Sequence, residues 1–169
     1  MSRVEEIKQQ IEELEKKTQE LQHELEVEKQ KTEIEYPPLK VSDNYCAIDD
    51  EGNVFYTWWS EDDLDKNRRR VGNVFITDEE ARRERDRRIL LTCFRQFRDK
   101  CNGDWKPDFN DDNSWKYCIA FNHNHNMMKI YSYLNIQEFH LFGYFKKESD
   151  AERAIELFGD EIKRLYLEW

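Results

Sequence analysis

The stretch VEEIKQQIEELEKKTQELQHEL, residues 4–25, repeats apolar side chains at alternating spacings of three and four. This spacing is typical of a helix that joins other helices along one apolar seam. The first 35 residues also contain no aromatic residue. We therefore predict a coiled-coil oligomerisation helix over residues 1–35, and the side chains expected in its seam are Val4, Ile7, Ile11, Leu14, Leu21 and Leu25, with Thr18 at the remaining position.

Two alternatives to self-association remain for this helix. It can stand alone as a solvated helix, or it can fold back on the rest of its own chain. The seam mixes β-branched residues and leucine, and the flanking charges give no clean pairing code, so the number of helices in the bundle stays open.

Residues 36–169 form one further domain in this interpretation, an aromatic-rich binding domain that begins at Tyr36-Pro37-Pro38, where the prolines end the helix. Two runs, 45–48 and 54–59, flank a turn that contains Gly52 and predict a β-hairpin. A third strand is expected at 71–76. Thr77 and Glu80 then form a capping box that opens a helix over 78–100.

The second half of the domain repeats this order. A hairpin is predicted over 115–121 and 127–133, and a strand over 140–145. Ser149 and Glu152 predict a second capping box, followed by a helix up to Gly159 and a short helical turn at 161–167. The expected fold class is α+β, with antiparallel hairpins, two capped helices and an internal duplication.

The chain carries a net charge of −10, which disfavours binding to nucleic acid over its whole surface. It has no apolar run long enough to cross a membrane. Its four cysteines lack a Cys-x-x-Cys spacing, and its N-terminal residues lack an apolar export segment. We therefore expect reduced thiols and a cytoplasmic location, with no membrane partner.

The sequence offers residues for three kinds of catalytic or metal site, and its spacings favour none of them. His123 and His125 lie two residues apart and offer two metal ligands, but no cysteine or acidic partner lies at a recognised metal spacing, so a polar turn is favoured. Acidic residues at 61–65 and 108–112 lack the pattern of a calcium loop and are expected in solvated loops. No histidine is paired with a cysteine by its spacing. The sequence therefore predicts no enzyme, no metal and no cofactor.

The strongest binding candidate is a cluster of arginines early in the predicted helix 78–100, namely Arg82, Arg83, Arg85, Arg87 and Arg88. Their guanidinium groups suit phosphates or an acidic protein surface. Acidic residues at helical spacing, such as Glu84 and Asp86, can instead pair with them inside the molecule.

Trp58 and Trp59 form a second candidate. Neighbouring residues of a strand face opposite sides of a sheet, so at most one of the two indoles can enter the core. The other is expected near the surface, either as an anchor for a partner or under a loop.

Three segments carry a resemblance to a family of small uncharacterised proteins from phages and prophages. Residues 72–81, GNVFITDEEA, resemble the family's Gly-Asn-x-Phe-x-Thr-x-Glu-Glu-Ala motif, and residues 102–109 resemble its Gly-x-Trp-x-Pro-Asp-aromatic loop. Residues 145–163 resemble its closing segment. The family implies no catalytic activity. In place of its usual Glu/Lys helix, this chain has the arginines at 82–88.

Together these features predict a non-enzymatic phage or prophage accessory protein that associates with itself through residues 1–35 and binds a host or defence macromolecule, as an anti-defence inhibitor does. The alternative is a nucleotide or nucleic-acid binding protein, in which the arginines contact phosphates and aromatic side chains stack on bases.

Overall fold

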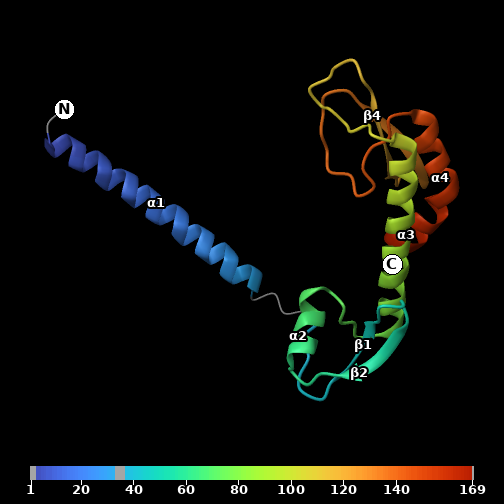
Figure 1. Ribbon diagram of the computed structural model, residues 1–169, viewed down its shortest axis with the longest axis horizontal. Coiled ribbons are helices and arrows are strands. Elements are labelled where there is room, and N and C mark those ends of the chain that lie inside the picture. The colour runs from blue at the N-terminus through green and yellow to red at the C-terminus, as the bar shows by residue number, and fades with distance from the viewer. Residues whose placement is uncertain (1–2, 33–36, 169) are drawn as a thin grey trace. The chain divides into compact units, whose positions relative to one another are not determined.

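The computed structural model describes residues 3–32 and 37–168 of the chain (Figure 1). It contains four α-helices, a closing π-helical turn and two small antiparallel sheets in this part, so the predicted α+β class is confirmed. No helix in these two ranges is long and apolar enough to span a bilayer. The chain divides into two compact units, one made of residues 1–44 and 58–74 and the other of residues 45–57 and 75–169.

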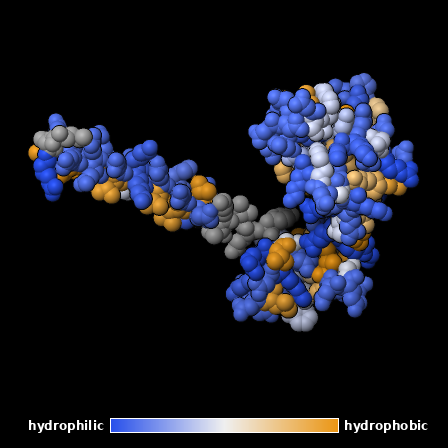
Figure 2. Space-filling view, turned by 45° about the horizontal axis from the view of Figure 1, so that its top comes forward, coloured by the Kyte–Doolittle hydropathy of each residue, from blue (hydrophilic) through white to orange (hydrophobic). Residues whose placement is uncertain are grey.

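Helix α1 (Arg3–Thr32) confirms the predicted N-terminal helix. Glu5 and Glu6 lie in its first turn, where carboxylates interact favourably with the positive end of the helix dipole. In the face that Figure 2 shows, apolar side chains of α1 gather along one edge of the helix, and hydrophilic ones cover the rest of that face.

The first hairpin consists of β1 (Asn44–Ile48) and β2 (Val54–Trp58), as predicted. The predicted strand at 71–76 is wrong in extent, because only Phe75 pairs there, with Cys46 of β1. Helix α2 (Asp63–Arg70) lies where the sequence predicted a solvated acidic loop. The Asp62 side chain accepts a hydrogen bond from the Asp65 amide and thereby begins this helix.

Helix α3 (Asp78–Asn102) begins at the predicted capping box, in which Thr77 accepts from the Glu80 amide at 3.1 Å. The second hairpin, β3 (Lys116–Asn122) with β4 (Met127–Tyr133), is also confirmed. The predicted strand 140–145 shortens to one bridge between Phe145 and Tyr117.

Helix α4 (Glu148–Ile162) differs from the sequence interpretation at both ends. Its N-cap is Lys147, which makes no side-chain capping bond, and Ser149 lies inside the helix. The predicted second capping box is therefore wrong. The helix also continues through Gly159, where a Cβ atom would lie 3.7 Å from Met128 of β4, and it ends in the π-helical turn η1 (Lys163–Leu167).

The core of the second unit lies between α3, α4 and the β3–β4 hairpin. The two helices lie side by side in Figure 1. The Phe94 ring occupies the centre, with centroids 4.6 Å from Phe142, 5.8 Å from Phe145 and 5.3 Å from Phe158. Burial of such large rings is the main stabilising contribution to a core of this size.

The two halves of the chain after α1 share an order of hairpin, turn, bridge and helix, although α2 has no counterpart in the second half. Gly72 and Gly143 each end a turn with φ of +69°, and each amide donates to the carbonyl three residues earlier. The bridging residues Phe75 and Phe145 follow, and Ala81 and Ala151, six residues further on, are both fully buried. Only glycine adopts such a φ without strain, which explains its presence in both turns.

Candidate functional site

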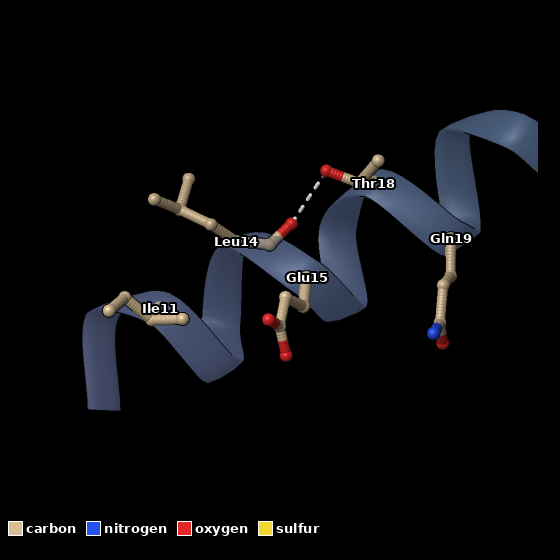
Figure 3. A pocket seen from close by; sticks show the side chains of 5 residues that line it. All are labelled: Ile11, Leu14, Glu15, Thr18 and Gln19. Carbon is tan, nitrogen blue, oxygen red and sulfur yellow. Dashed lines mark hydrogen bonds between the residues drawn. The ribbon is translucent and has the colours of Figure 1, made fainter. Parts of the chain in front are cut away.

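The apolar seam of α1 is an exposed apolar surface that runs along most of the helix. Its six predicted side chains are between 46 % and 64 % exposed. Figure 3 shows Leu14 and Thr18 on one side of the helix and Glu15 and Gln19 on the other. The Thr18 hydroxyl donates to the Leu14 carbonyl at 2.8 Å, so the polar residue in the seam is satisfied within its own helix.

The arginines of α3 are engaged by other groups of the same chain. Arg82 pairs with Asp78 and Arg88 with Glu84, each four residues apart on the helix. Arg85 donates twice to Asp86, at 3.0 and 2.7 Å. These contacts match the intramolecular alternative that the sequence left open.

Two of these arginines bind the C-terminal turn. Arg87 Nε donates to the Leu165 carbonyl at 2.7 Å, and its guanidinium lies 5.2 Å from the centre of the Tyr166 ring. Arg83 Nη1 donates to the Glu168 carbonyl at 2.8 Å. A helix end leaves carbonyl groups without intrahelical partners, and here two guanidinium groups satisfy them.

A groove beside these arginines is lined by Thr77, Glu79, Glu80, Arg83 and Arg87. Two carboxylates and two guanidinium groups share it, so their charges offset each other. An anionic ligand would meet repulsion from Glu79 and Glu80 in this groove. The arginine cluster therefore does not present an uncompensated phosphate site.

The structure separates the two tryptophans as the strand geometry predicts. Trp59 is 2 % exposed, and the Arg69 guanidinium of α2 lies 4.0 Å from the centre of its ring. Trp58 is 66 % exposed. Trp59 therefore cannot contact a partner in this conformation, which removes it from the expected binding surface, whereas Trp58 remains available to one.

Tyr56 is a second exposed aromatic of β2 that the sequence interpretation missed. It is 69 % exposed and shares a side of the strand with Trp58, because residues two apart face the same way. Desolvation, followed by the negative charge of Asp78, raises the pKa of Tyr56. The sequence could have predicted this exposed pair, because aromatic residues two apart in a strand lie on the same face.

The structure also pairs a cysteine with a histidine. Sγ of Cys118 lies 3.3 Å from Nε2 of His140, and a Glu138 carboxylate oxygen lies 3.6 Å from that same nitrogen. In a nucleophilic triad the thiol and the orienting carboxylate contact opposite nitrogens of the imidazole, so this arrangement does not assemble one. Burial and the charge of Glu138 also raise the pKa of Cys118 to about 11, which keeps the thiol protonated near neutrality.

The remaining candidates have structural partners. His125 bonds Asn122 in the turn between β3 and β4, and the His123 ring stacks edge-on against Phe121. Asp65 is buried and accepts two hydrogen bonds from Ser60. Within residues 3–32 and 37–168, no group of three or more His, Cys, Asp or Glu side chains is placed to hold a metal ion.

Comparisons with protein-family models, with curated proteins and with solved structures found no match to this chain.

Proposed function

We propose that this chain is a non-enzymatic binding protein that self-associates through α1 and presents several copies of its folded domain to a macromolecular partner. The observation that carries the proposal is the α1 seam, whose six apolar side chains follow heptad spacing and stay exposed. Isolated helices depend on packing of an apolar face for most of their stability, and a second copy of the same seam supplies that packing.

The partner class in this proposal is a host or defence protein. It follows from the resemblance of residues 72–81 to phage proteins and from the exposed indole of Trp58. Exposed tryptophan is enriched among residues that dominate protein interfaces. Self-association adds avidity, because each further contact forms at a high effective concentration.

Binding of nucleotides or nucleic acid is the weaker alternative. Arg82, Arg85 and Arg88 contact neighbouring carboxylates, and Arg83 and Arg87 contact carbonyls. A phosphate ligand would have to displace those contacts on a chain of net charge −10. No contact on these arginines favours such a ligand over the internal pairing.

Light scattering during size-exclusion chromatography tests self-association. The variant with Leu14→Glu and Leu21→Glu places charges in the seam and is expected to have the mass of one chain. The matched control, Gln9→Glu with Gln19→Glu, adds the same charge off the seam and is expected to stay oligomeric. A wild-type chain that is monomeric at tens of micromolar would refute the proposal.

A binding comparison tests the partner class. The full chain and a Trp58→Ala variant would each be incubated with lysate of a bacterial host, and the retained proteins compared. We expect a protein that wild type retains and Trp58→Ala loses. Retention of nucleic acid that falls steeply with salt would favour the alternative instead.

A further inference from the structure

The loop from Leu134 to Leu141, which follows β4, holds the most exposed large apolar side chain of the described residues. Phe139 is 92 % exposed, and Ile136 is 56 % exposed on the same loop. A phenylalanine in this position contributes almost nothing to the core, since it hardly leaves solvent on folding. Its side chain is therefore free to be buried by something else.

The residues on both sides of Phe139 are fixed to the folded domain. The Tyr144 hydroxyl accepts a hydrogen bond from the Glu138 amide at 3.1 Å and donates to the Glu138 carbonyl at 2.8 Å. The Tyr133 hydroxyl donates to the Glu138 carboxylate at 3.0 Å. His140 lies against Cys118 of β3 at 3.3 Å. Phe139 is thus held outward by its two anchored neighbours.

The start of the loop is fixed by a buried lysine. Lys116 is fully buried, and its Nζ donates to the Leu134 carbonyl and to the Asp111 carbonyl, both at 2.7 Å. The same ammonium therefore ties the loop to the neighbouring acidic loop 103–115. A loop ordered before binding loses less conformational entropy when a partner binds.

The loop that carries Phe139 and the loop that Lys116 ties to it have a net negative charge, although Arg98 of α3 also donates to the Phe142 carbonyl at 3.1 Å. Residues 101–115 and 134–145 contain five carboxylates and one basic side chain other than His140, namely Lys106. Lys116 belongs to β3 and is buried. An acidic surface with a projecting apolar ring repels nucleic acid and anionic lipid and complements a basic surface.

We propose that loop 134–141 is a docking element for a protein partner that has an apolar pocket rimmed by lysine or arginine, with Phe139 filling the pocket. This surface includes neither the α1 seam nor Trp58, and the proposal stands on the contacts of Glu138, His140 and Lys116. Aromatic anchors in the centre of an interface account for a large part of its affinity.

The test compares four full-length chains as bait in lysate of a bacterial host: wild type, Phe139→Ser, Trp58→Ala and Leu157→Ser. Leu157 is 48 % exposed on α4 and serves as the matched control for loss of an apolar side chain. A protein retained by wild type and Leu157→Ser but lost by Phe139→Ser would then be purified and titrated against each chain. Melting curves would establish that Phe139→Ser is folded.

We expect Phe139→Ser to weaken the purified complex at least about tenfold and Glu138→Gln to weaken it by a smaller factor that shrinks at high salt. Equal retention of every protein by wild type and Phe139→Ser would overturn the proposal. So would a purified partner whose affinity is unchanged by Phe139→Ser. A complex lost only with Trp58→Ala would leave the proposed function standing and refute this docking element.

Discussion

Sγ of Cys118 lies 3.3 Å from Nε2 of His140, although the two residues belong to strand β3 and to the loop after β4. The contact fixes that loop against the face of β3 opposite the main core. Because the thiol is fully buried, its thiolate form is strongly disfavoured, and the pKa of Cys118 rises from 9.0 to about 11.

The raised pKa of Cys118 makes stability depend on pH in the alkaline range. Below pH 9 the thiol is protonated in the folded and in the unfolded chain, and its contribution to folding is fully present. Between pH 9 and about 11 only the unfolded chain ionises, so the free energy of unfolding falls, by an amount on the order of 2 kcal/mol. Urea denaturation at a series of pH values measures this loss.

The matched comparison is Cys118→Ala. It is needed because other groups with a raised pKa, such as Tyr133, also make stability fall at high pH. The alanine variant is expected to lose less stability over that interval than wild type. Iodoacetamide at pH 8 is expected to label the exposed Cys93 well before Cys118. Equal pH profiles for the two chains, or early labelling of Cys118, would contradict this account.

Replacing Lys116 with methionine is expected to lower the free energy of unfolding by about 2–3 kcal/mol, because the carbonyls of Asp111 and Leu134 lose a charged donor. Hydrogen exchange should rise in both loops that the lysine joins. Lys106→Met, at an exposed position, is the control and is expected to change stability little. Equal stability of the two variants would show that the ammonium does not fix these loops.

Comparing Thr77→Ala with Ser149→Ala tests which of the two residues caps a helix. Both precede a glutamate by three residues, but only Thr77 is an N-cap. The Thr77 hydroxyl accepts a hydrogen bond from the Glu80 amide. Thr77→Ala is therefore expected to lower the free energy of unfolding by about 1 kcal/mol. Ser149 lies inside α4 and makes no capping bond, so its truncation should be close to neutral. Thermal denaturation of both variants measures the difference, and a larger loss for Ser149→Ala would reverse the assignment.

The double variant Arg83→Ala with Arg87→Ala is expected to destabilise the chain by about 2–3 kcal/mol, since each arginine donates to a carbonyl of the C-terminal turn. Hydrogen exchange should increase over 163–168. Arg153→Ala, which removes an exposed pair with Glu156, is expected to be nearly neutral. An unchanged melting temperature for the double variant would instead favour an external role for these arginines.

The elements that the sequence predicted well carry strong local signals. Helix α1, the two hairpins and the Thr77 capping box each depend on residues close together in the chain. The predicted strands at 71–76 and 140–145 shortened to single bridges, because pairing depends on which strand lies beside them. Helix α2 was missed because its run of acids followed by arginines has no apolar periodicity, and its stability comes from the Asp62 cap and buried Asp65.

The candidate sites also differ in whether local sequence was enough to predict them. Strand alternation was enough to predict that Trp58 and Trp59 face opposite sides. The pairing of Cys118 with His140 was not predictable, since the residues are 22 apart and meet only when the loop after β4 folds over β3. The choice between internal and external partners for Arg83 and Arg87 needed the position of the C-terminal turn, 78 to 85 residues away.

Helix α3 is anchored at two places along its length. Near its start Ala81 is fully buried, and in its second half Leu90 and Phe94 lie in the core with α4 and β3. Each residue added to a helix turns everything beyond it by about 100° and shifts it by about 1.5 Å. A single-residue insertion or deletion between Ala81 and Leu90 would therefore rotate one anchor out of register with the other. The number of residues between Ala81 and Leu90 should accordingly be held constant in natural variants of this chain.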